Sequence, residues 1–286
     1  MKRNHFIALG TALVLLAGLY FLAPTVNPKR VAPEPVADQH EHEGPEALQI
    51  GAVETRISST FTPAQKSRWE QAQKMLANKT SNDSLEAYRQ LAGFYRDSVS
   101  NALLHFNYLA DEASLVNTEK SLTFAAHSIL AYLPYLQNDA EVDWLANKSN
   151  QLFDKALRIN PENDSTIVGY GGTIMFGAGP PDQAMNGITR VRDVANRDSN
   201  FLFAQYMLGV GGMLSGQYDR AAERFEKVAR LQPDNIEVKF KTAEAYEQGG
   251  KNQKAIEWYE DIARHVRQPE LLQAVNQRLE ELRKKN

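Results

Sequence analysis

The sequence predicts an all-α fold in which pairs of helices stack in a row. Four pairs of chemically matched residues lie 34 positions apart: Gly216/Gly250, Ala221/Ala255, Glu223/Glu257 and Phe225/Tyr259. From Pro63 onward, apolar residues recur at helical spacing. The segment ending at Pro161 also resembles the one ending at Pro233. Self-similarity at a fixed period indicates stacked units, because one unit cannot bury its apolar face alone.

The composition narrows the possible functions. The chain has 286 residues, of which 43% are hydrophobic and 23% charged, so a packed core is expected. Its net charge of −3 gives no basic surface, and we expect no nucleic acid partner. It contains no cysteine, which excludes disulfides, thiolate metal sites, cysteine nucleophiles and lipid-carrying cysteines. The compartment is not identified by this absence, since helical arrays need no disulfides.

Residues 1–23 are predicted to form an N-terminal transmembrane anchor. Phe6–Ala23 is an 18-residue stretch without a charge. As a helix it spans about 27 Å, close to the hydrocarbon thickness of about 30 Å. A cleaved secretory signal is the alternative, but Phe21 and Pro24 around Ala23 disfavour cleavage.

The anchor implies a location. We expect a single-pass protein of the cytoplasmic (inner) membrane, with its body facing the periplasm or the outside. Lys2 and Arg3 precede the span, but Lys29 and Arg30 follow it, which weakens the charge asymmetry. A cytoplasmic body therefore stays open as an alternative.

Residues 24–62 are predicted to be a flexible linker. The segment is rich in proline and acidic residues and has no aromatic residue before Phe61. Such a composition buries too little apolar surface to offset the entropy of ordering. A flexible chain of this length has an end-to-end distance on the order of 35 Å, so the body would work clear of the bilayer.

Residues 63–160 are predicted to be an N-terminal helical part with divergent helix pairs. A first helix begins near Pro63, with Thr62 as its N-cap. The pair 83–116 opens with apolar residues that share one helical face, and 118–160 forms a second pair broken at Asn138-Asp139. The lengths of these pairs depart from 34 residues, so the number of repeats before residue 160 stays open.

Residues 161–267 are predicted to contain three helix pairs, at 164–197, 201–231 and 235–266. Each begins after a proline turn or a polar break. Residues 268–286 are predicted to form a capping helix, whose leucine and valine side chains share one side and whose basic residues lie among the polar positions.

The repeated residues resemble the tetratricopeptide repeat (TPR), a helix–turn–helix unit. Small residues match the family's eighth position at Gly171, Gly209 and Ala243, and its twentieth at Ala221 and Ala255. Phe225 and Tyr259 match the aromatic that fills the gap to the next unit. The resemblance is specific over 201–266 and good from about residue 150. It implies a TPR-type α-solenoid, a right-handed superhelix of helix pairs.

The resemblance also implies a binding surface. TPR proteins commonly hold a protein or peptide segment on the concave face, lined by the first helix of each pair. The matching positions in this chain are Val168, Met175, Phe176, Phe203, Tyr206, Val210, Met213, Leu214, Phe240, Glu244 and Glu247. We expect a groove that is apolar in the middle and acidic at its C-terminal flank, suited to an apolar or amphipathic segment with basic residues. Coverage of these residues by adjacent helices is the alternative.

Together these features predict a membrane-anchored, non-catalytic scaffold or adaptor of the cell envelope. An assembly factor similar to the TPR modules of cytochrome c maturation, or a subunit of a secretion or envelope complex, is the alternative. We see no nucleophile–base pair, metal set or cofactor fingerprint, so we expect neither an enzyme nor a cofactor or metal. A self-associating array remains a third class, and the oligomeric state and partner stay open.

Overall fold

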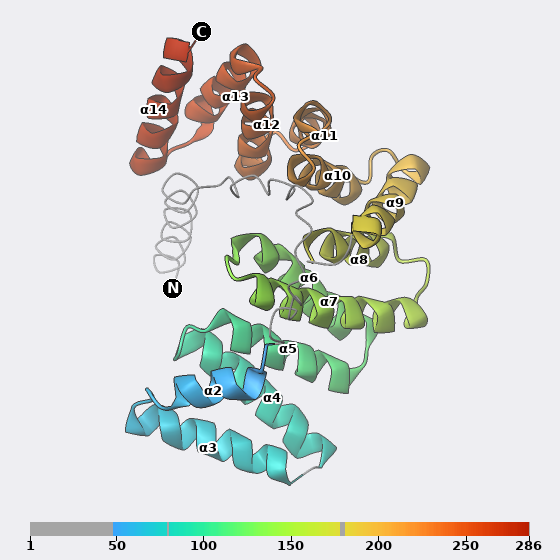
Figure 1. The fold of residues 1–286 in the computed structure, drawn as a ribbon, viewed down its shortest axis with the longest axis vertical. Coiled ribbons are helices and arrows are strands. Elements are labelled where there is room, and N and C mark those ends of the chain that lie inside the picture. The colour runs from blue at the N-terminus through green and yellow to red at the C-terminus, as the bar shows by residue number, and fades with distance from the viewer. Residues whose placement is uncertain (1–47, 79, 178–180, 286) are drawn as a thin grey trace, which may run out of the picture. The chain divides into compact units, whose positions relative to one another are not determined.

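The computed structural model describes residues 48–78, 80–177 and 181–285. Across these ranges the chain forms thirteen α-helices and one 3₁₀ turn, and contains no strand (Figure 1). The prediction of an all-α fold is confirmed for these residues. None of their helices combines the length and apolar character that a membrane crossing requires. The predicted anchor Phe6–Ala23 lies outside the described residues.

The described chain divides into two compact units, with the boundary after Met207. We call residues 48–207 the N-terminal unit and residues 208–285 the C-terminal unit. The boundary falls within one helix, α10, at Leu202–Leu214.

The N-terminal unit is built mainly from three helix pairs preceded by two further helices. Its elements are α2 Ile50–Ser58, α3 Pro63–Ala77, α4 Ser81–Asp97, α5 Ala102–Val116, α6 Glu119–Tyr132, η1 Leu133–Tyr135, α7 Asp139–Ile159, α8 Asp164–Phe176, α9 Pro181–Arg197 and the start of α10. The pairs are α4 with α5, α6 with α7, and α8 with α9. Neighbouring pairs bury a shared core in which helices α5 and α7, and α6 and α8, also meet.

The C-terminal unit continues the same construction. Its elements are the end of α10, α11 Tyr218–Leu231, α12 Ile236–Gln248, α13 Asn252–His265 and α14 Pro269–Lys285. Each of α12, α13 and α14 packs on the helix before it. Ala221 and Ala255, which share a repeat position, are both fully buried. Phe225 and Tyr259 are exposed by no more than 2% of their surface. The small and aromatic residues of the repeat therefore have the packing roles that the pattern indicates.

Local signals explain where helices begin and turn. The Thr62 hydroxyl accepts from the Gln65 backbone N–H, and Pro63 occupies the first turn, as predicted. Asparagine side chains cap several later helices in the same way, for example Asn163 for α8. The repeated glycines Gly216 and Gly250 both have φ of +71°, a conformation that L side chains rarely adopt.

The structure departs from the predicted linker within residues 48–62, and residues 24–47 of that linker lie outside the described residues. Helix α2 lies inside the segment 24–62 that we expected to be a flexible linker. The prolines of that segment all precede Ile50, and within α2 the residues Ile50, Val53 and Ile57 share one helical face. A nine-residue helix is marginal alone, so its order depends on the surface that receives it.

Candidate functional site

Helix α2 is held on the N-terminal unit by one glutamate. The Glu54 carboxylate oxygen Oε1 accepts hydrogen bonds from Tyr95 Oη at 2.7 Å and Tyr108 Oη at 2.8 Å. It also accepts from Trp69 Nε1 at 2.9 Å and Gln73 Nε2 at 3.1 Å. We call the surface made by these four donors on α3, α4 and α5 the helix-docking face. Side chains up to 54 positions away from Glu54 in the sequence thus donate to one carboxylate oxygen.

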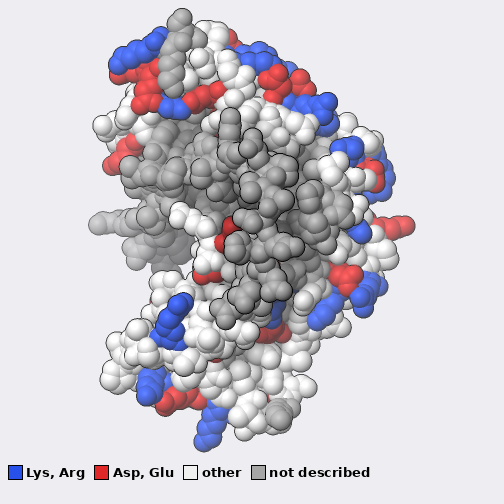
Figure 2. Space-filling view, viewed as in Figure 1, with Lys and Arg blue, Asp and Glu red and all other residues white. Residues whose placement is uncertain are grey.

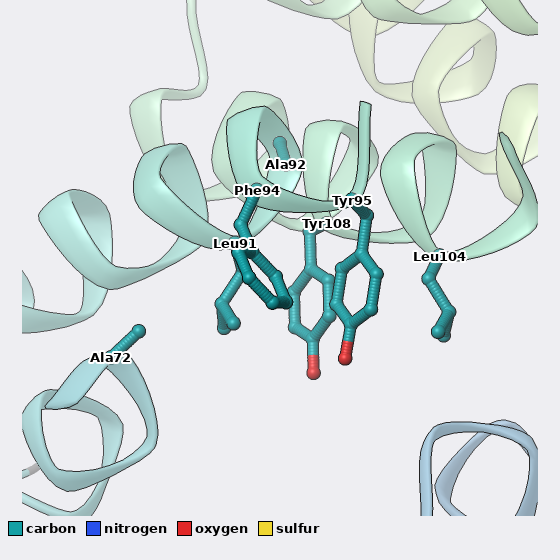
Figure 3. Close-up of a cluster of buried hydrophobic side chains, with 7 residues drawn as sticks. All are labelled: Ala72, Leu91, Ala92, Phe94, Tyr95, Leu104 and Tyr108. Carbon is teal, nitrogen blue, oxygen red and sulfur yellow. The ribbon is translucent and has the colours of Figure 1, made fainter. Parts of the chain in front are cut away.

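The two tyrosines of this face are fixed in place by each other as well as by Glu54. Their rings stack in parallel, with centroids 5.7 Å apart and planes 2° apart, and Figure 3 shows their hydroxyl oxygens side by side. Burial, reinforced by the Glu54 carboxylate, raises the pKa of Tyr95 and of Tyr108 above the ordinary value of 10.0. Both hydroxyls are therefore protonated donors at neutral pH.

Apolar contacts flank the glutamate on both sides. Ile50 and Ile57 pack against the buried cluster of the face, whose members are Ala72, Leu91, Ala92, Phe94, Tyr95, Leu104 and Tyr108 (Figure 3). Ile50 lies four residues before Glu54 and Ile57 three residues after it, so all three lie on one side of α2. The contact is an amphipathic helix laid on the surface of α3, α4 and α5, an arrangement that also occurs in peptide recognition.

The chemistry of the face defines what it can bind. All four donors are uncharged, and each offers an N–H or O–H to the same point. Hydrogen bonds to an ionised acceptor are shorter and stronger than neutral ones. In this structure the face holds a carboxylate that lies between two apolar side chains of α2.

The predicted groove residues of the N-terminal unit differ in exposure. Val168 is completely buried, so it contributes to the core and not to a surface. Met175, Phe176, Phe203 and Tyr206 are each half-buried. These four side chains retain surface that a partner could contact.

Phe203 belongs to an aromatic cluster around His127. The Phe203 and His127 rings meet edge to face with centroids 5.5 Å apart, and Phe153 contacts the same imidazole at 4.9 Å. His127 Nε2 lies 3.3 Å from Ser165 Oγ, and burial lowers the pKa of the imidazole. The cluster gives Phe203 a fixed orientation.

The predicted groove residues of the C-terminal unit also separate into two kinds. Phe240 is buried against Tyr259. Val210 and Met213 are half-buried, and Leu214 is 58% exposed. Val168 and Phe240 thus lie in the cores of their units, which removes both from the expected groove surface.

The expected acidic flank is already in use inside the fold. Glu247 binds the Arg278 guanidinium of α14 through both carboxylate oxygens, and Arg278 also binds Glu281. Glu244 is largely enclosed, and its nearest cation is Lys241 at 3.7 Å. A basic partner would have to displace Arg278 to reach Glu247. Arg278 of α14 thus makes the contact that we expected from a basic residue of a partner.

Sequence reasoning misses the helix-docking face. The helical spacing of apolar residues places Tyr95 on one face of its helix, but it does not single out Glu54 or Tyr108. The available signal is the spacing of Ile50, Val53 and Ile57 around one carboxylate, followed by a capped helix start at Thr62. Composition over a long window conceals this signal, because five prolines before residue 46 dominate the segment.

Charged side chains of the described residues do not form a metal cluster. Within these ranges no group of three or more His, Asp or Glu side chains could hold a metal. On the face shown in Figure 2, acidic and basic side chains of the described residues lie intermingled.

The described residues form a protein of stacked helix pairs, in which side chains of each helix pack against neighbouring helices. A family model described as tetratricopeptide repeat matches residues 213–279. The resemblance to this repeat that the sequence indicates is therefore supported over these residues. Tetratricopeptide repeats are a fold used for protein interaction. No curated protein matches the chain at a significant level.

Solved structures of similar architecture have low identity. A MamA fragment, residues 41 to the end, from Desulfovibrio magneticus RS-1 is 18% identical, covers 64% of this chain and 95% of its own, and has a TM-score of 0.42. TTC0263, a thermophilic TPR protein from Thermus thermophilus, is 11% identical over 76% and 98%, with a TM-score of 0.46. YrrB, described as a TPR protein with an unusual peptide-binding site, is 15% identical over 72% and 97%, with a TM-score of 0.40. None of these three likenesses bears on what this chain binds.

Proposed function

We propose that this protein is a non-catalytic scaffold that binds a segment of a partner protein on the surfaces of its repeat helices. The observation that carries the proposal is α2 on the helix-docking face. There helices α3, α4 and α5 of the N-terminal unit hold a further helix through side-chain contacts to a carboxylate and two apolar residues. The unit can therefore recognise a helical segment by side-chain chemistry.

The half-buried aromatic residues of α8 and α10 provide a second candidate surface for the partner. Phe176, Phe203 and Tyr206 retain exposed area, and Phe203 is oriented by His127. Aromatic residues that are rigid and partly exposed lose little conformational entropy on binding, which favours them as contact residues.

The proposal includes a tether. The uncharged stretch Phe6–Ala23 would anchor the protein in the cytoplasmic membrane, with residues 24–49 as a spacer and the repeat body in the periplasm or outside. The length and apolar character of this stretch support the proposal. An anchored scaffold would raise the local concentration of its partner beside the membrane.

The test is affinity purification of the tagged full-length protein from its native membranes. We expect the Phe203→Ala and Tyr206→Ala variants to lose a copurifying polypeptide, because each removes a partly exposed aromatic side chain. Ile159→Ala, which alters a residue 50% exposed on α7, is the matched control. Equal recovery with all three variants, at unchanged circular dichroism, would reject this surface as the binding site.

A further inference from the structure

Helix α2 differs from the helices it packs on. It contains no buried residue, whereas α3, α4 and α5 each contain at least one. Its N-cap residue, Gln49, makes no side-chain cap hydrogen bond. With nine residues it is shorter than the roughly 12–15 residues that an isolated helix needs for marginal stability. Its order therefore comes from the docked side alone, which places it among the elements that open most easily.

Part of the surface beneath α2 is held by contacts that do not involve α2. Tyr95 and Tyr108 stack on each other from two paired helices, and Leu91 and Leu104 are completely buried around them. Trp69 is packed edge to face with Phe61, with centroids 6.2 Å apart. If α2 left, ring stacking would still hold the two tyrosines beside each other, and the four donors would lack their shared acceptor.

We propose that the helix-docking face is a binding site for an amphipathic helix of a partner protein, and that α2 is the internal helix which the partner displaces. The partner helix presents a carboxylate with a branched apolar residue four positions before it and another three positions after it, as Ile50, Glu54 and Ile57 do in α2. This rests on the proposed interaction function and specifies its ligand.

The connection to α3 determines how the exchange is regulated. Only residues 59–62 separate α2 from α3, so α2 is present at a high effective concentration beside its site. A free helix of equal chemistry competes poorly with it, and a partner must supply additional contacts. The internal helix thus sets a threshold that excludes weak acidic helices.

The probe is a fluorescent peptide that covers residues 48–60. We expect it to bind the full-length Ile50→Asp/Ile57→Asp variant at least tenfold more tightly than the wild-type chain, because aspartates remove the apolar contacts of the internal helix. A Glu54→Gln peptide should bind this variant at least tenfold more weakly than the wild-type peptide, since it lacks the charge that strengthens four hydrogen bonds.

Two substitutions in the receiving chain locate the binding. Tyr108→Phe, added to the double variant, should weaken the peptide severalfold because one hydroxyl donor is lost. Ile159→Ala, added in the same way, should leave the affinity unchanged. Equal affinity for the two peptides, or an unchanged affinity with Tyr108→Phe, would overturn the proposal.

Hydrogen exchange of the wild-type chain keeps the proposal testable if the double variant fails to fold. We expect the amides of residues 53–58 to exchange at least tenfold faster than those of α4, and faster still with excess peptide. Protection equal to that of α4, unaffected by peptide, would show that α2 is a permanent part of the fold and would overturn the proposal. A dimer that exchanges α2 would also overturn it, because the occupant would be a second copy.

The two proposals fail separately. Loss of peptide exchange together with a partner that depends on Phe203 and Tyr206 would leave the scaffold function standing. If the peptide exchanges but no protein copurifies, the proposal for the helix-docking face is supported. The function proposed for the α8 and α10 surface is then rejected.

Discussion

Gly171 and Gly187 set the distance between α8 and α9. A Cβ atom built on either glycine would lie 2.6 Å from the backbone carbonyl oxygen of the other. Gly171 is predicted from its repeat position, where the family keeps a small residue, and Gly187 is not. The obstacle is backbone on both sides, so no side-chain rotation can relieve it.

Gly171→Ala should therefore destabilise the N-terminal unit. Overpacking of a well-packed core costs about 1–3 kcal/mol, and we expect the free energy of unfolding to fall by that amount. Gly93→Ala in α4 is the matched control, because a Cβ atom added there meets nothing within 4 Å beyond its own stretch of helix. It should raise the free energy by about 0.5–1 kcal/mol through helix propensity. Urea denaturation measures both, and equal effects would contradict the close approach.

Glu244 makes stability depend on pH. Burial raises the pKa of its carboxyl above the ordinary 4.5, Glu247 adds to this rise, and Lys241 opposes it. At low pH the group is protonated in both the folded and the unfolded chain, so it has no effect. As pH rises above 4.5 the unfolded chain loses the proton first, and the folded state is progressively disfavoured until its own pKa is passed.

Glu244→Gln should consequently raise the melting temperature at pH 7, and this gain should disappear as the pH falls below 4.5. Glu257→Gln, an exposed carboxylate on α13, controls for the change in net charge. Thermal melts across acidic to neutral pH provide the comparison. A gain in melting temperature that grew toward low pH would show that the pKa of Glu244 is lowered and not raised.

At the scale of elements, the recurring alanines allow adjacent helices to pack closely. Ala255 is completely buried on α13, and its repeat counterpart Ala221 is buried on α11. Ala255→Leu adds side-chain volume at a completely buried position, and we expect the free energy of unfolding to fall by about 1–3 kcal/mol. Ala131→Leu on the exposed side of α6 should change stability by less than about 0.5 kcal/mol. Guanidinium denaturation would reveal the difference, and similar midpoints would contradict it.

Helix boundaries could be predicted from the sequence because their signals are local. Thr62 and Pro63 mark one start, and α14 begins within a residue of its predicted start. These residues act through their own backbone or through near neighbours, so spacing along the chain is sufficient evidence.

The helix-docking face could not be predicted in the same way. Glu54 and Tyr108 are 54 positions apart, and no short-range rule joins them. Likewise, the pairing of Glu247 with Arg278 spans 31 positions and turns the expected acidic flank into an internal contact. Side chains of the groove positions could be placed on a helix from the repeat pattern, but their coverage by other helices depends on tertiary packing.

At the scale of the whole molecule, the proposed anchor and the repeat body have separable roles. Removal of residues 1–23 should shift the protein from the membrane fraction to the soluble fraction while its helical circular dichroism is kept. The reason is that the uncharged stretch Phe6–Ala23 would supply the membrane affinity. The full-length chain, extracted with carbonate, is the control. Continued membrane association of the truncated chain would contradict the tether.

The central claim, that the repeat body holds a partner polypeptide, is tested most directly by photo-crosslinking in living cells. A photoreactive residue is placed at position 203 or 206, with position 159 on α7 as the control. The account predicts one prominent polypeptide adduct at 203 and 206, identified by mass spectrometry and absent at 159. Adducts of equal yield at all three positions, or at none of them, would contradict it.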